Sequence, residues 1–194
     1  MEIYLLRHGR TTRPGTYTGV SDVDLAETGR RQILSLSPHL LEIRFDHCYC
    51  SPLKRCRQSL SLLNIKCGLT IDENLREIDF GDWEGLSFAE VQDRFPEDVE
   101  GWMKAGDDFQ FPRGDATRDF CLRVSGWFDE LVRTAYDRVL VVSHGGVLRY
   151  GICQLLGIDK KHGFALHVQE GLLSKVFVAH GIGRLEFLNR MGSG

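Results

Sequence analysis

Three apolar runs dominate the pattern of hydrophobic positions along the chain. Residues 3–6 (Ile-Tyr-Leu-Leu) and 138–142 (Arg-Val-Leu-Val-Val) are nearly free of polar side chains, and residues 48–50 (Cys-Tyr-Cys) form a shorter run. Unbroken aliphatic and β-branched runs are typical of strands buried on both faces, as in the parallel sheets of α/β proteins. The runs therefore predict strands of a central, mostly parallel sheet.

Helical spacing and helix-capping residues occupy the segments between and after these runs. Ser51 and Pro52 are preferred types for an N-cap and a first helical position. Ser87 and Glu90 fit a capping box that opens a short helix, and Pro96 is expected to end it. The other predicted helices span residues 28–41, 52–63, 117–136 and 145–156, the last closing at Gly157, and residues 172–179 and 184–188 predict an antiparallel hairpin around Gly181 and Gly183.

The alternation of strands and helices over 194 residues predicts a single α/β domain spanning residues 1–194, with helices on both faces of the sheet. Residues 80–113 hold seven aromatic side chains and are expected to form a small cap inserted above the sheet. Those rings could stack on a heteroaromatic ligand or pack the core of the cap itself. Packing is the favoured interpretation for any single ring, but least so for Trp83, which lies next to an acidic loop.

Two histidines follow two of the predicted strands in the same way. Arg7-His8-Gly9 ends the first run, and Ser143-His144-Gly145 ends the run at 138–142. In open α/β sheets the ligand crevice lies outside the carboxyl ends of the strands, so His8 and His144 meet there if their strands are parallel neighbours. An imidazole can attack phosphorus, and an arginine fork suits phosphate oxygens. The alternative is two unrelated structural histidines.

Two further segments carry candidate chemistry. Arg55 falls in the first turn of the helix predicted after Ser51, where free N–H groups and the helix dipole favour anions. A solvated surface position is the ordinary alternative for such an arginine. Residues 75–85 have the composition of a functional loop, and one acid there could protonate a leaving alkoxide and then activate water. Composition alone does not choose among its four acids, Glu77, Asp79, Asp82 and Glu84.

The four segments in this order resemble the histidine phosphatase (phosphoglycerate mutase-like) superfamily. Residues 17–25, followed by Gly29 and Gln32, and residues 76–85 are similar to its α-ribazole phosphatase branch, which removes the 5′-phosphate from α-ribazole 5′-phosphate or the corresponding cobalamin phosphate. The resemblance implies a three-layer phosphoglycerate mutase-like fold. It also implies a phosphomonoesterase that works through a phosphohistidine and needs no metal ion or other cofactor.

Roles for individual residues follow from the same resemblance. His8 is implied as the nucleophile and Glu77 as the acid and later the base. Two guanidinium groups, Arg7 and Arg55, and an imidazolium, His144, would surround the transferred phosphoryl group. The implied substrate-binding residues are Arg7, Gly9, Thr18, Gly19, Arg55, His144 and Gly145.

Three positions depart from the pattern of the superfamily. Arg10 stands where Glu or Gln is usual; it could select a more anionic substrate, and pairing with Asp22 or Asp24 is the favoured interpretation. Residues 13–14 (Arg-Pro) replace the Trp-Asn pair of the mutases, which counts against mutase activity. Asp115 stands where Glu is common, one methylene shorter. A broad-specificity sugar-phosphate phosphatase, a phosphoglycerate mutase-like enzyme and a catalytically silent phospho-ligand-binding domain stay open as alternatives.

Charge and composition limit the classes of partner that the protein is expected to bind. The net charge of −3 lacks the positive excess typical of nucleic-acid-binding proteins. The chain contains no run of 18 apolar residues, so no membrane span is predicted. Because Arg7 and His8 interrupt the early apolar segment, no signal peptide is expected. The expected reduced state of the cysteines implies a cytoplasmic protein, and its partner is expected to be a small phosphomonoester, with a homodimer left open. Residues 191–194 are expected to be a disordered end. Reduced thiols rather than disulfides are expected at Cys48, Cys50, Cys56, Cys67, Cys121 and Cys153.

Overall fold

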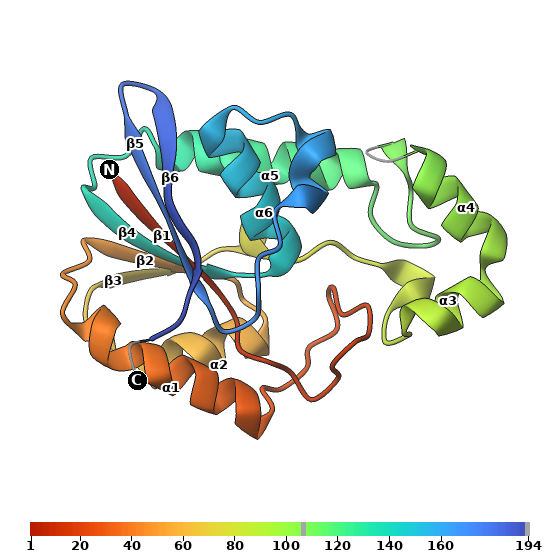
Figure 1. The fold of residues 1–194 in the computed structure, drawn as a ribbon, viewed down its shortest axis with the longest axis horizontal. Helices are drawn as coiled ribbons and strands as arrows, with labels where there is room; N and C mark the ends of the chain where they lie inside the picture. The colour runs from red at the N-terminus through yellow and green to blue at the C-terminus, as the bar shows by residue number, and fades with distance from the viewer. Residues whose placement is uncertain (106–107, 193–194) are drawn as a thin grey trace.

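In the computed structural model, which describes residues 1–105 and 108–192, the strands of the described chain form one sheet in the order β3-β2-β4-β1-β5-β6 (Figure 1). Strands β1, β2, β3 and β4 run parallel to one another, whereas β5 is antiparallel to β1 and to β6. The prediction of a mostly parallel sheet is confirmed. The strands are β1 Glu2–Arg7, β2 His47–Cys50, β3 Gly68–Ile71, β4 Arg138–Ser143, β5 Leu173–Ala179 and β6 Ile182–Arg190.

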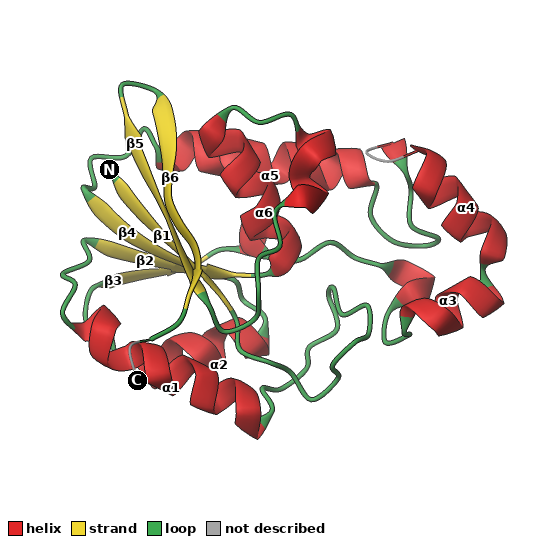
Figure 2. Ribbon diagram, in the orientation of Figure 1, coloured by secondary structure: helices red, strands yellow, loops and turns green. Residues whose placement is uncertain are grey.

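Helices cover both faces of the sheet, as predicted (Figure 2). α1 (Glu27–Leu41) and α2 (Lys54–Leu63) lie on one face, and α5 (Thr117–Leu131) and α6 (Gly145–Leu156) lie on the other. Alternate side chains of β1 point to opposite faces: Ile3 and Leu5 enter the core under α5 and α6, and Tyr4 and Leu6 enter the core under α1 and α2. Each strand of the centre is therefore buried on both sides, which explains its unbroken apolar run.

Two helix boundaries differ from the predicted ones. The N-cap of α2 is Leu53, not Ser51, and it makes no side-chain cap bond. Ser51 is fully buried and its hydroxyl turns to the site described below, so the N-cap interpretation is wrong. α5 ends at Leu131 rather than Tyr136, because Arg133 and Thr134 close a tighter turn on Glu130 and Leu131.

The described residues of the cap form two α-helices, where the sequence predicted one. α3 (Phe88–Arg94) has the predicted capping box, with Ser87 and Glu90 bonded to each other's backbone. Pro96 begins α4 (Pro96–Ala105), a position that suits proline because the first helical N–H has no intrahelical partner. Both helices stand apart from the sheet at one end of the molecule (Figure 1). Trp83 is fully buried among the rings of Trp102, Phe109 and Phe111, so packing, the favoured interpretation, holds even for the ring for which it was least favoured.

The C-terminal hairpin forms as predicted, with a longer second strand. His180 and Gly181 turn the chain with φ of 51° and 74°, a conformation in which glycine carries no Cβ penalty. Of the predicted disordered end, Ser193 and Gly194 lie outside the described residues. Gly192 lies against α1, where a Cβ would come within 1.9 Å of the Ser35 carbonyl oxygen. Among the helices of the described ranges, none combines the length and apolar character needed to span a bilayer.

Candidate active site

The carboxyl ends of three adjacent parallel strands bring the predicted histidines together. The register pairs Arg7 of β1 with Ser143 of β4, and Cys50 of β2 with Val142 of β4. The next residues, His8, His144 and Ser51, therefore leave the sheet at one edge. The ring centroids of His8 and His144 are 5.2 Å apart, which confirms that the two motifs meet.

His8 is held as a neutral imidazole with one free nitrogen. Its Nδ1 lies 2.8 Å from the Gly9 carbonyl oxygen, and since a carbonyl only accepts, Nδ1 carries the proton. The lone pair is then on Nε2. Burial, and next the positive charges of Arg55 and Arg7, hold the pKa of His8 well below 6.5. These features suit a nucleophile.

His144 is fixed by two neighbours and is also neutral. Arg55 Nε donates to His144 Nδ1 at 3.1 Å, so the proton of the neutral ring is on Nε2, which donates to Ser51 Oγ at 2.7 Å. Burial, followed by the cations of Arg55, keeps the pKa of His144 well below 6.5. The expected imidazolium at His144 is therefore wrong. Ser51 was missed as a site residue, because its partner lies 93 positions away and Ser-Pro is equally typical of a helix start.

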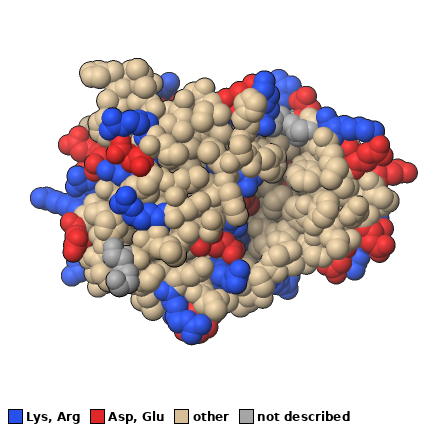
Figure 3. Space-filling model, in the orientation of Figure 1, with Lys and Arg blue, Asp and Glu red and all other residues tan. Residues whose placement is uncertain are grey.

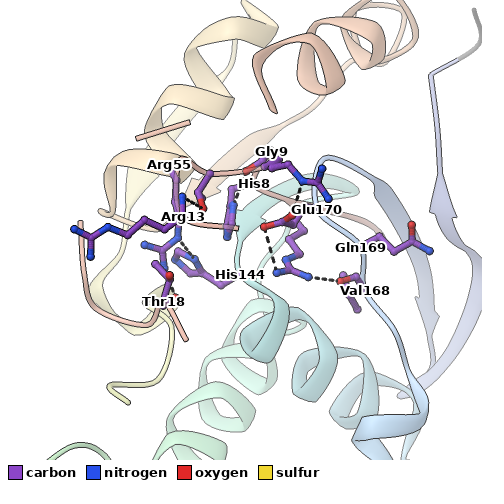
Figure 4. Close-up of polar contacts among 12 residues, drawn as sticks. His8, Gly9, Arg13, Thr18, Arg55, His144, Val168, Gln169 and Glu170 are labelled. Carbon is purple, nitrogen blue, oxygen red and sulfur yellow. Dashed lines mark hydrogen bonds and ion pairs between the residues drawn. The ribbon is translucent and has the colours of Figure 1, made fainter. Parts of the chain in front are cut away.

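Arg55 is fully buried, and protein acceptors engage all three of its guanidinium nitrogens. Besides His144, these acceptors are the carbonyl oxygens of Ser21 at 2.9 Å, Gly19 at 2.6 Å and Thr18 at 3.3 Å. Figure 4 shows Arg55, Thr18 and His144 together on one side of His8. The Gly9 amide, another predicted phosphate contact, donates to Ser59 Oγ.

Arg7 lies next to a carboxylate that the sequence did not single out, Glu170, which Figure 4 shows on the opposite side of His8 from Arg55. Its Nη1 donates to the Val168 carbonyl at 2.7 Å, and its Nη2 is 3.7 Å from Glu170. Arg10 pairs with the same Glu170 at 3.8 Å. The expected pairing of Arg10 with Asp22 or Asp24 is wrong, because those carboxylates bond Lys54 and Gln58. A Cβ on Gly145 would lie 3.2 Å from the Arg7 guanidinium carbon, so glycine leaves that side chain its room.

The structure separates the four candidate acids. Asp79 bonds the Gly81 amide, Asp82 pairs with Arg113, and Glu84 bonds backbone amides of residues 19–21. Glu77 alone of these four lines the cavities at the sheet edge. The Gly146 amide in the first turn of α6 donates to Glu77 Oε2 at 2.9 Å, so the positive end of the helix orients this carboxyl group.

Asp115, the third departure from the family pattern, is a structural contact of the acidic loop. Its Oδ2 accepts from the Asp79 amide at 3.0 Å, and its own amide donates to the Asp79 carbonyl at 2.9 Å. The shorter side chain therefore reaches the loop two residues from Glu77.

Two cavities share this site, and both touch Arg7, Thr16, Thr18 and Glu77. Figure 3 shows the surface hollowed between the sheet domain and the cap. The apolar lobe, about 370 Å³, lies under the cap and is walled by Tyr17, Ile78, Phe80, Trp102, Phe111, Thr117, Phe120, Arg149, Tyr150 and Phe164, with Gly145 and Gly146. The polar lobe, about 420 Å³, includes His8, Arg10, Thr11, Arg13, Gly15, Gln32, His167, Gln169 and Glu170.

We expect the free energy of unfolding to fall as the pH drops from about 7.5 to 5. His8 and His144 stay neutral in the fold, whereas in the unfolded chain they bind protons near pH 6.5. The unfolded state then binds more protons, which lowers stability by up to about 1.4 kcal/mol per pH unit for each histidine. Urea unfolding across this range measures the slope, and His8→Asn should remove roughly half of the histidine contribution. A flat profile would contradict the buried neutral pair.

Comparisons with known proteins agree on one group of relatives. The model of the histidine phosphatase superfamily (branch 1) matches residues 3–190. The chain is 33% identical over 164 residues to phosphoserine phosphatase 1 of Hydrogenobacter thermophilus, covering 82% of this chain and 78% of the relative. It is 30% identical to the adenosylcobalamin/α-ribazole phosphatase of Escherichia coli, over 100% of this chain and 98% of the relative. The crystal structure of the α-ribazole phosphatase from Shigella flexneri superposes with a TM-score of 0.91 at 27% identity, covering 98% and 96%.

Proposed function

The chain belongs to the histidine phosphatase superfamily, and on that premise we propose that it hydrolyses phosphomonoesters through a phosphohistidine formed at His8. One observation carries the proposal. The Nδ1–H of His8 is committed to the Gly9 carbonyl, so the unprotonated Nε2 is available in a cavity that Arg7 and Glu77 also line. A neutral imidazole beside an arginine and a carboxyl group has what phosphoryl transfer requires.

In the first step, His8 Nε2 attacks phosphorus, a P–N bond forms and the ester P–O bond breaks. The protonated carboxyl group of Glu77 gives its proton to the leaving oxygen. The guanidinium groups of Arg7 and Arg55 lie close enough to His8 to act on its charge, so both would place positive charge where the non-bridging oxygens gather charge. His144 lies against His8 and is held by Arg55.

In the second step, the Glu77 carboxylate takes a proton from water while the water oxygen attacks phosphorus. The P–N bond breaks, inorganic phosphate leaves and His8 returns to its neutral form. Because Glu77 lines both lobes, it can serve a leaving group in one lobe and accept a proton from water that enters through the other.

α-Ribazole 5′-phosphate, or the corresponding cobalamin phosphate, is the substrate we propose first. The apolar lobe adjoins Arg7 and Glu77, and aromatic rings of both the sheet domain and the cap face it. An aromatic base attached to the esterified ribose would be packed by Phe80, Trp102 and Phe164. The relatives from E. coli and S. flexneri that carry this activity in their names support the choice.

A second candidate, O-phosphoserine, is favoured by the charges of the polar lobe. Glu170 presents a carboxylate beside the phosphate-binding Arg7, and Arg10 presents a guanidinium beside Glu170. An ammonium group and a carboxylate on one leaving group would find opposite charges there. The phosphoserine phosphatase of H. thermophilus is among the relatives, which supports testing this substrate directly.

The test is kcat/KM for phosphate release from α-ribazole 5′-phosphate, O-phosphoserine, a panel of sugar phosphates and 3-phosphoglycerate. A preference of about 100-fold for the first, about 2.7 kcal/mol in transition-state binding, supports the cobalamin assignment. A flat profile would favour a broad-specificity phosphatase, conversion of 3-phosphoglycerate to its isomer would favour a mutase, and no turnover of any ester would favour a silent binding domain.

Two variants test which lobe binds which substrate. Phe164→Ala removes a ring that is 62% exposed and lines the apolar lobe, so it should leave the fold intact. We expect it to lower kcat/KM for α-ribazole 5′-phosphate by roughly three- to tenfold, the value of about one ring contact, and to spare O-phosphoserine. Glu170→Gln should lower kcat/KM for O-phosphoserine and spare α-ribazole 5′-phosphate. Equal losses on both substrates for either variant would contradict separate lobes.

A further inference from the structure

The half-buried Glu84 carboxylate is surrounded by hydrogen-bond donors, and no proposed chemical step uses it. Its Oε1 accepts from the amides of Gly19 at 2.9 Å, Val20 at 3.0 Å and Phe80 at 3.2 Å. Its Oε2 accepts from the Ser21 amide and from the Ser21 hydroxyl. Successive backbone N–H groups that converge in this way form a nest for an anion, and here the anion is a side chain of the protein.

The opposite edge of the same backbone segment holds Arg55. The peptide group joining Thr18 and Gly19 points its N–H at Glu84 and its C=O at Arg55. The peptide group joining Gly19 and Val20 does the same, with its C=O 2.6 Å from Arg55 Nη2. Since a trans peptide group is planar and its N–H and C=O point in opposite directions, fixing one side fixes the other.

The chain of contacts continues to the histidines. Arg55 Nε donates to His144 Nδ1, and the His144 ring lies against His8. The segment is tightly packed at its centre, because a Cβ on Gly19 would lie 1.9 Å from the Ile78 carbonyl oxygen and 2.5 Å from Glu84 Oε1. Glu84 therefore sits at one end of a rigid connection, and the phosphate-binding guanidinium sits at the other.

We propose that Glu84 is a positioning residue for the phosphate site: it orients the peptide groups of residues 18–20, and their carbonyl oxygens hold Arg55 and, through it, His144. The inference rests on the phosphate-binding role proposed for Arg55. Glu84 itself lines neither lobe, so any effect it has on phosphate must be indirect, and the carbonyl bonds of residues 18 and 19 to Arg55 are the connection that leads to the guanidinium.

Glu84→Gln tests the proposal at nearly constant volume. The new amide nitrogen is a donor and meets backbone donors, so the nest loses acceptors and the segment shifts. We expect kcat/KM for p-nitrophenyl phosphate to fall at least about tenfold, since a misplacement of ~1 Å can cost about 100-fold. The inhibition constant of inorganic phosphate should rise several-fold. Asp82→Asn is the matched control, because Asp82 lies in the same loop and pairs outward with Arg113.

A purely structural role predicts a different result. Glu84→Gln would then lower the Tm while leaving kcat and the phosphate inhibition constant within about twofold of the control, and that outcome overturns the proposal. The Arg55→Lys variant already lacks the guanidinium group that the carbonyl oxygens hold. In that variant, Glu84→Gln should lower kcat/KM by less than about a further twofold, since the effects of coupled residues are not additive. Independent, multiplicative losses would also overturn it.

A second variant and a binding measurement cover the cases in which Glu84→Gln does not fold or the wild-type protein hydrolyses no ester. If Glu84→Gln does not fold, Ser21→Ala removes one donor of the nest and should lower kcat/KM by roughly two- to fivefold, as loss of one hydrogen bond to a charged group would. Phosphate affinity can be measured by calorimetry without turnover. A wild-type protein that binds phosphate but hydrolyses no ester would refute the proposed function, while the effect of Glu84→Gln on phosphate binding would still decide the role of Glu84.

Discussion

His8→Ala is expected to lower phosphatase activity by at least about 1,000-fold, because it removes the only group proposed to bond phosphorus. The fold should persist, since the ring of His8 makes its one side-chain hydrogen bond to the adjacent Gly9 carbonyl. Activity on p-nitrophenyl phosphate and the circular dichroism spectrum measure the two parts of this expectation. Near-normal activity in a folded variant would exclude the phosphohistidine mechanism.

A covalent trap separates the nucleophile from a mere phosphate ligand. Wild-type protein mixed with labelled substrate and quenched in alkali should retain label as a phosphoramidate that acid releases, and His8→Ala should retain none. His180→Asn is the matched control, because His180 lies in an exposed hairpin turn with a φ of 51° that asparagine tolerates. Equal labelling of His8→Ala and the control would place the nucleophile elsewhere.

The features that the sequence predicted share a physical origin. Strands β1 and β4 are recognisable because burial on both faces demands unbroken apolar runs, and parallel pairing then forces the residues after them, His8 and His144, to one edge. Strand β3 was not predicted because it is only four residues long and all four are exposed at the sheet edge, so it has no buried apolar run. Helix α4 was missed because Pro96 was interpreted as an end when it is a beginning.

The features that escaped prediction depend on partners distant in the chain. Nothing near Ser51 indicates that its hydroxyl bonds His144, and nothing near Arg10 indicates Glu170 as its partner. Asp22 and Asp24 were nearer in sequence, but Lys54, Gln58 and the start of α2 engage both carboxylates. Local sequence patterns identify which residues have side chains suited to phosphate chemistry. Their hydrogen-bond partners are fixed only when the tertiary structure brings distant segments together.

Glu77→Gln is expected to slow hydrolysis in proportion to how poorly the alcohol leaves. A proton from the acid matters when an alkoxide departs and matters little when a nitrophenolate does, because the latter is stable without one. We expect the phosphoenzyme-forming step to lose about 100- to 10,000-fold on an alkyl phosphate, the usual range for a general acid, and less than about tenfold on p-nitrophenyl phosphate. Rapid-quench measurement of the first turnover isolates this step from hydrolysis of the intermediate.

The same variant should also let the phosphoenzyme accumulate, since Glu77 is the proposed base for water. With p-nitrophenyl phosphate this gives a burst of nitrophenolate followed by a slow steady rate. The Glu73→Gln variant is the control, because Glu73 lies in the preceding turn, exposed and paired with Arg76, and should behave as wild type. Equal losses on the aryl and alkyl esters, without a burst, would show that Glu77 acts on binding rather than on proton transfer. The bond from the Gly146 amide argues for the proton-transfer role, because it fixes one carboxyl oxygen and leaves Glu77 lining both lobes, where the leaving group and the water must be.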